Sequence, residues 1–284
     1  MPRRQLGRHL RELRQESGLT IAEVARLIER GAGTVQRLET GTPHRIRLLD
    51  IEALCRVLQA DATMTDALLG LARQGNDRSW WHEYGDLIPS DFDVYIGLES
   101  AARTLTSFNV LVPGLLQTPS YAESLIRAAY PDNESSDIGR RVQMRLHRQK
   151  IVTREWRPIR MTALLDEQIL HRIVGSPAIM AQQLKHLADV GTRGNVEVRV
   201  VPFAAGVPLG DLTGPFTILD FEQGTKGRRE PSVVYVDGYT GDLYLERSES
   251  VDRYRIAFQT SARVALNPQQ TRDLLRQVAR RYVR

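Results

Sequence analysis

The chain has 284 residues, of which 42% are hydrophobic and 26% charged, with a formal net charge of +5 at pH 7. This composition excludes a largely disordered chain, and the length is sufficient for two domains. No apolar run approaches the roughly 18 residues that span a bilayer, and the first residues lack the apolar core of a signal peptide. We therefore expect a cytoplasmic protein. The single cysteine, Cys55, excludes an internal disulfide and lies among apolar residues, which predicts a buried thiol.

Residues 3–18 predict an amphipathic helix rich in arginine. Leu6, Leu10 and Leu13 recur at helical spacing, and Gly18 is a typical residue for the end of a helix. The remaining positions carry five arginines: Arg3, Arg4, Arg8, Arg11 and Arg14. Downstream, Ile51, Leu54 and Leu58 predict a further amphipathic helix.

Between these segments the sequence predicts two short helices. Thr20 and Glu23 have the spacing of a capping box, and the apolar residues that follow face inward: Ile21, Val24, Ala25 and Ile28. We expect Gly31-Ala32-Gly33 to form the reversal before a second helix with Val35 and Leu38 inward and Gln36 and Arg37 outward. This pattern predicts a helix-turn-helix, a motif whose second helix enters the major groove of DNA.

The basic excess lies in this same region. The first 60 residues contain 11 arginines against 7 acidic residues, whereas the remainder contains 28 basic and 27 acidic residues. A basic surface attracts phosphates and makes affinity for DNA fall with salt. Charge therefore supports the prediction of DNA binding.

Residues 1–75 resemble the Xre and phage-repressor group of DNA-binding domains, through Leu19-Thr20, Ala25 and the run Arg37 to Gly41. The resemblance implies a buried ion pair between Arg14 and Glu39 that ties the first helix to the recognition helix without touching DNA. Members of the group usually carry polar side chains where this chain has Gly31, Ala32 and Gly33. Direct base readout then depends on Thr34, Gln36 and Arg37, with modest specificity or dependence on DNA shape and on pairing of two domains.

We expect DNA contacts from helix starts, from the recognition helix and from flanking arginines. Thr20 and Ile21 would bring helix N–H groups to a phosphate, and Arg45 and Arg47 would hold flanking phosphates. The complete predicted set is Thr20, Ile21, Ala32, Gly33, Thr34, Gln36, Arg37, Arg45 and Arg47. Because such domains pair on half-sites, we expect a homodimer on double-stranded DNA.

Residues 76–90 are the predicted linker, and residues 91–284 the predicted second domain, of α+β class with a small mixed sheet. Expected helices cover residues 95–105, 119–126, 138–155, 167–174, 177–190, 249–264 and the segment after 267. Expected strands cover residues 161–166, 196–201, 216–221, 233–237 and 243–246. The helix at 138–155 carries Arg140, Arg141, Arg145, Arg148 and Lys150, which we interpret as a solvated face rather than a second basic patch.

The sequence contains no convincing catalytic or metal site. Asp166-Glu167 is the best candidate for acid–base chemistry, but acidic residues at a helix start are explained by the helix dipole. The six histidines lack metal-ligand spacing, and Gly224-Thr225-Lys226-Gly227 lacks the spacing of a phosphate-binding loop. We predict no enzyme activity, no cofactor and no metal.

Two apolar segments are candidates for a ligand site or for an interdomain contact. They are the pair Trp80-Trp81 and the segment containing Leu115, Leu116 and Gln117. Large aromatic and leucine side chains at a domain boundary more often fill a core or an interface, which we favour here.

Almost the whole chain resembles the abundant actinomycete regulators typified by WhiJ, an antitoxin-like (Scr-type) family with a carboxyl-terminal domain of uncharacterised function. The matching motifs are Trp80-Trp81, residues 95–99, 111–119, 165–167, 201–203, 214–217 and 233–236. The resemblance implies a dimeric transcription regulator with a small acidic partner protein encoded nearby. The alternatives are a ligand-sensing regulator with a small-molecule pocket in the carboxyl-terminal domain, and a module that neutralises a toxic protein.

Overall fold

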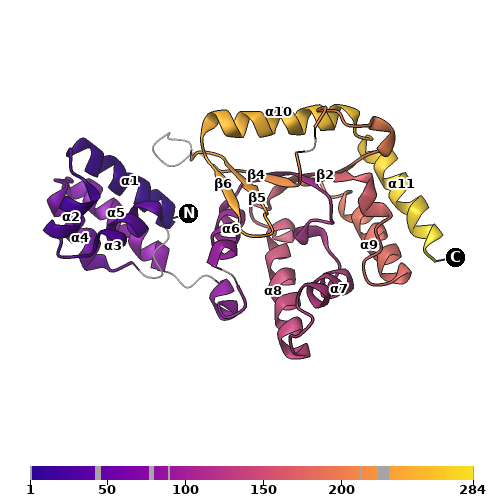
Figure 1. The fold of residues 1–284 in the computed structure, drawn as a ribbon, viewed down its shortest axis with the longest axis horizontal. Helices are drawn as coiled ribbons and strands as arrows, with labels where there is room; N and C mark the ends of the chain where they lie inside the picture. Colours follow the sequence, from indigo (N-terminus) through magenta and orange to yellow (C-terminus); the bar gives the residue numbers. More distant parts are fainter. Residues whose placement is uncertain are drawn as a thin grey trace. The chain divides into compact units, whose positions relative to one another are not determined.

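The computed structural model describes residues 2–41, 46–76, 80–88, 90–211, 213–222 and 230–283. The chain divides into two compact units, residues 1–82 and 83–284, which are described separately below (Figure 1). Within the described residues, no helix combines the length and the apolar character that crossing a membrane requires.

The first unit is helical throughout its described elements. These are α1 (Pro2–Glu16), α2 (Ile21–Leu27), α3 (Ala32–Thr40), α4 (Leu48–Val57), α5 (Ala62–Asn76) and the start of a 3-10 helix at Trp80–Tyr84. One apolar core holds the helices together, and it includes Leu6, Leu10, Val24, Ala25, Val35, Leu38, Ile51, Leu54, Cys55 and Leu58. The inward positions predicted from helical spacing are therefore confirmed. Burial also raises the pKa of the Cys55 thiol.

The second unit contains both helices and strands. Its helices are α6 (Ser90–Ala101), α7 (Pro119–Ala129), α8 (Ser135–Thr153), α9 (Pro177–Val190), α10 (Ser248–Val264) and α11 (Pro268–Arg281). Its strands are β1 (Thr104–Asn109), β2 (Arg160–Asp166), β3 (Val196–Val201), β4 (Phe216–Asp220), β5 (Val233–Val236) and β6 (Leu243–Leu245). The predicted α+β class is confirmed.

The strands form one mixed sheet in the order β3-β2-β1-β4-β5-β6. β1, β2 and β3 run parallel, whereas β4, β5 and β6 pair antiparallel. α10 covers one face of the sheet, and α6, α7 and α8 lie on the other (Figure 1). Val251 of α10 packs with Ile218 and Val234, while the Tyr95 ring of α6 lies 4.2 Å from the Tyr235 ring.

Helix starts agree well with the local sequence. Thr118 Oγ1 accepts a hydrogen bond from the Tyr121 N–H at 3.4 Å, with proline at the first helical position of α7. Asn267 Oδ1 accepts from the Gln270 N–H at 2.9 Å in a complete capping box before α11. Such caps depend on four consecutive residues, so a sequence alone can reveal them.

Two helices of the second unit differ in extent or type from the prediction. The helix expected through Leu105 ends at Ala101, and Leu105 lies instead in β1, between β2 and β4. Thr104, Leu105, Thr106 and Ser107 alternate in burial as a strand does. The helix expected at residues 167–174 is only a 3-10 helix at Glu167–Leu170, started by the Asp166 side chain.

The expected solvated face of α8 is wrong for Arg145 and Arg148, whereas Lys150 is exposed as expected. Arg148 is only 6% exposed and Glu99 of α6 only 2%. Arg148 Nε and Nη2 donate to the two carboxylate oxygens of Glu99 at 2.9 and 2.8 Å. This bidentate pair ties α8 to α6 beneath the sheet. Arg145 also turns inward, where it donates to the Gln117 side chain at 2.8 Å.

Loss of the Arg148 charge should leave Glu99 buried without a partner. We expect Arg148→Met to reduce the stability of the second unit by about 3–5 kcal/mol. Arg140→Met is the matched control on the same helix, since Arg140 pairs with Asp86 at the surface, and it should cost less than about 1 kcal/mol. Hydrogen exchange of α6 and α8 peptides measures both effects, and equal protection losses in the two variants would contradict the assignment.

Candidate nucleic-acid interface

α3 presents one polar side to solvent and one apolar side to the core. Val35 and Leu38 are buried, whereas Gln36 and Arg37 are exposed and Thr34 is half-buried. Arg37 Nη2 lies 3.4 Å from Thr34 Oγ1, one turn earlier on the same side. Of the three side chains expected to read bases, two are therefore exposed on α3 and the third, Thr34, is half-buried.

The reversal before α3 differs from the prediction. Residues 31–33 do not form the turn, because α2 already ends in a motif in which the Arg30 N–H donates to the Ala25 carbonyl at 2.8 Å. Glu29 provides the left-handed residue of that turn, with φ of 53°. Gly31, with φ of −71°, is the N-cap of α3, and Ala32 and Gly33 form its first turn.

The start of α3 is open to an approaching anion. Gly31, Ala32 and Gly33 are exposed, and Gly31 provides no side-chain cap. The first N–H groups of a helix lack acceptors within the helix and carry a partial positive charge. Because the side chains here are so short, a phosphate oxygen has room to approach these N–H groups.

The start of α2 is less suited to a phosphate than expected. The Thr20 N–H donates to Glu23 Oε2 at 2.8 Å, and Thr20 Oγ1 accepts from the Glu23 N–H at 3.2 Å, which confirms the capping box. Hydrogen bonds from Thr20 lower the pKa of Glu23, so this exposed carboxylate is ionised at neutral pH. The predicted phosphate contact through the Thr20 N–H therefore competes with an anion already in place.

An ion pair fixes α3 against α1. Arg14 Nε and Nη2 donate to the two oxygens of Glu39 at 2.6 and 3.0 Å, and Glu39 is only 6% exposed. The third donor, Arg14 Nη1, bonds to the Leu19 carbonyl at 2.9 Å, just before α2. One guanidinium thus ties α1 to α3 and to the chain entering α2. Hydrogen bonding to Glu39 raises the pKa of Arg14, so the pair stays charged.

A close helix crossing, which sequence reasoning missed, supports the same arrangement. At Gly7 of α1, an added Cβ would lie 2.4 Å from the Leu38 carbonyl oxygen and 2.6 Å from that of Glu39. Glycine is therefore required where α1 crosses the end of α3. The atoms that require glycine here belong to Leu38 and Glu39, so no pattern in the sequence around Gly7 indicates the crossing.

Two protein-family models match this chain. Residues 5–68 match the model of a helix-turn-helix domain, and residues 92–277 match a domain of unknown function, DUF5753. The chain belongs to the DUF5753 family. Its first unit carries a helix-turn-helix domain of the kind found in DNA-binding regulators, which fits an Xre-like protein. Comparisons with curated proteins and with solved structures found no match for this DUF5753 protein.

The remaining predicted site residues of the DUF5753 protein lie outside α2 and α3. Arg47 is exposed at the N-cap of α4, and Arg45 lies outside the described residues. Arg30 Nη2 pairs with Asp50 at 2.9 Å, which anchors the α2–α3 turn to α4. The sequence 224–227 also lies outside the described part of the chain.

The candidate carboxylates Asp166 and Glu167 have structural partners. Asp166 Oδ1 accepts from the Gln168 N–H at 2.9 Å, and Glu167 Oε2 accepts from the Phe203 N–H at 2.6 Å. Across the residues with described positions, no three His, Cys, Asp or Glu side chains gather as metal ligands would. The carboxylates thus cap and join segments of backbone.

The two segments considered for a ligand site belong to different units. Trp80 and Trp81, in the first unit, contact each other edge to face with centroids 5.7 Å apart. In the second unit, Leu115, Leu116 and Gln117 are buried. Gln117 Nε2 donates to the Val112 carbonyl at 2.7 Å. These three residues fill the interior of the second unit.

An alanine at position 7 should separate α1 from α3. We expect Gly7→Ala to destabilise the first unit by about 1–3 kcal/mol, since the added methyl meets backbone oxygens. Gly70→Ala is the matched control within a helix, because an added Cβ there meets nothing within 4 Å. It should stabilise α5 by about 0.5–1 kcal/mol. Hydrogen exchange of α1 and α3 peptides decides, and unchanged protection in Gly7→Ala would refute the close crossing.

Proposed function

We propose that this DUF5753 protein is a sequence-specific DNA-binding transcription regulator that reads its operator with α3. The observation that carries the proposal is the exposed side of α3, with its uncapped first turn, on a helix held by the Arg14–Glu39 pair. A recognition helix needs these properties, because it must enter the major groove with its orientation fixed.

The proposed contacts follow from the geometry of α3. The N–H groups of Ala32 and Gly33 would bind a backbone phosphate. Thr34, Gln36 and Arg37 would reach base edges, with Arg37 suited to the two acceptors of guanine and Gln36 to adenine. Ile21, Arg47 and Arg45 would contact flanking phosphates. Because residues 31–33 cannot reach bases, DNA shape is expected to supply part of the specificity.

The finer assignment rests on the sequence motifs. We propose a dimer on paired half-sites and membership of the WhiJ-like, antitoxin-like actinomycete regulators. In this proposal the second unit binds a small acidic protein encoded nearby. The structural roles of Asp166 and Glu167 give no support to a catalytic function for this unit.

The test measures the affinity of the full chain for genomic duplex fragments, including its own promoter. Fluorescence anisotropy gives that affinity at several salt concentrations. The proposal expects one or more fragments to bind far more tightly than random duplex. The logarithm of the affinity should fall linearly with the logarithm of the salt concentration. If every fragment binds no better than random duplex, the proposal of a sequence-specific regulator is wrong.

Arg37→Ala should weaken binding to the preferred fragment by about 1–3 kcal/mol and relax specificity at one base pair. Arg193→Ala is the control, because it removes the same charge from an exposed position in the second unit. Both variants are compared with the parent chain by anisotropy on the preferred fragment and on single-base variants. An equal loss in Arg37→Ala and Arg193→Ala would show that Arg37 does not read a base.

A further inference from the structure

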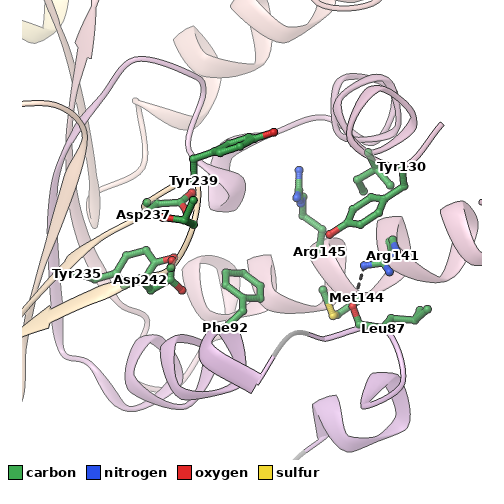
Figure 2. A pocket seen from close by; sticks show the side chains of 14 residues that line it. Leu87, Phe92, Tyr130, Arg141, Met144, Arg145, Tyr235, Asp237, Tyr239 and Asp242 are labelled. Carbon is green, nitrogen blue, oxygen red and sulfur yellow. Dashed lines mark hydrogen bonds between the residues drawn. The ribbon is translucent and has the colours of Figure 1, made fainter. Parts of the chain in front are cut away.

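The second unit contains a pocket of about 480 Å³. Figure 2 shows its lining side chains, which come from the segment before α6, from α6, the end of α7, α8, β5 and the turn between β5 and β6. The volume lies within the range of small-molecule sites in proteins. Phe92, Tyr130 and Met144 supply much of its apolar surface.

One part of the lining is cationic. Arg141 donates to the Leu87 carbonyl at 2.7 Å and lies 3.9 Å over the Tyr130 ring, while Arg145 donates to the neutral Gln117 side chain. No carboxylate pairs with either guanidinium among the described residues, and the Nε atom of each is buried without a hydrogen-bond partner there. Burial, together with the nearby Arg148 charge, lowers the pKa of Arg145 to about 10.

The neighbouring Arg148 shows what these two arginines lack. Its guanidinium is fully neutralised by Glu99, although it lies on the same helix one turn further on. A partly buried cation without a counter-ion is costly, and an arginine fork matches a carboxylate in shape and charge. The Arg141–Arg145 side of the pocket is therefore complementary to an anionic group.

A second part of the lining is acidic. Asp237 and Asp242 flank a tight turn in which the Gly241 N–H donates to the Gly238 carbonyl at 3.2 Å. A Cβ at Gly238 would lie 2.3 Å from the Gly241 carbonyl oxygen, so the turn requires glycine there. Partial desolvation, the Asp242 charge and a hydrogen bond with the Asp242 side chain raise the pKa of Asp237, which indicates two carboxyl groups held close together. A cationic group bound beside them would stabilise both carboxyl groups in their ionised form.

The two charged parts do not neutralise each other. In Figure 2 the aspartates project from the β5–β6 turn and the arginines from α8, with Phe92 also lining the pocket. No ion pair joins Asp237 or Asp242 to Arg141 or Arg145 among the residues described. A cavity with opposite charges on different walls and aromatic surface between them is complementary to a dipolar molecule.

We propose that this pocket binds a small zwitterion, with its carboxylate on Arg141 and Arg145, its ammonium on Asp237 and Asp242, and its apolar body against Phe92 and Tyr130. The site is independent of the proposed DNA contacts, so the failure of either proposal leaves the other standing.

The test uses three dipolar probes of increasing length with the full chain: γ-aminobutyrate, ε-aminocaproate and para-(aminomethyl)phenylacetate. Ligand-observed NMR and thermal shift measure binding, and the best probe should bind with a Kd on the order of 1 mM, as expected of fragments. The analogues of that probe that lack either the amine or the carboxylate should bind at least about tenfold more weakly.

Variants then assign the two ends. Arg145→Met and Asp237→Asn should each abolish the shift by the best probe, whereas Lys150→Met, an exposed charge loss on α8, should leave it unchanged. Circular dichroism checks that each variant is folded, and the comparison of analogues on the parent chain needs no variant. The proposal is overturned if none of the probes binds, or if an analogue with one charge binds as tightly as its zwitterion.

Discussion

The contact between α1 and α3 is the constraint on which the proposed recognition surface depends. Arg14 donates two hydrogen bonds to Glu39. Gly7 allows the two helices to approach so closely that a Cβ at this position would clash with the backbone of α3. Because Glu39 lies at the buried end of α3, its neutralisation fixes the rotation of that helix. Thr34, Gln36 and Arg37 then face solvent. A recognition helix with a poorly fixed orientation could not place its side chains accurately enough to discriminate between bases.

The second unit also contains a buried arginine–glutamate pair between two helices, but other arginines on the same helix have no such partner. The Arg148–Glu99 pair joins α8 to α6 as the Arg14–Glu39 pair joins α1 to α3. One and two turns earlier, however, α8 carries Arg145 and Arg141, which donate hydrogen bonds only to neutral acceptors, and Arg141 also lies over an aromatic ring. A partly buried charge without a counter-ion costs stability, and groups with perturbed pKa values cluster at functional sites. The contrast along a single helix is what distinguishes the pocket from ordinary surface charge.

Features set by a few consecutive residues could be predicted from the sequence. The capping boxes at Thr20 and Asn267 are examples, as are the apolar spacing of α1 and most strands of the sheet. The predicted reversal at Gly31-Ala32-Gly33 is wrong because a left-handed Glu29 makes the turn instead.

Features set by tertiary contacts could not be predicted. Whether an arginine on α8 faces solvent or the interior depends on Glu99, which lies 49 positions away. The pocket combines residues from α6, α7, α8 and the β5–β6 turn, and no spacing within any one of them indicates a site. Leu105 looked helical because β1 alternates over too few residues to be distinguished from the end of α6.

Selection of binding sites from random duplexes, performed with the full chain and with its Gln36→Ala variant, tests the central claim most directly. If α3 reads the operator, both proteins enrich a sequence built from paired half-sites. The variant should lose preference at one position in each half-site and keep the others. Identical enriched sequences for both proteins, or no enrichment at all, would contradict the account of α3 as the recognition helix.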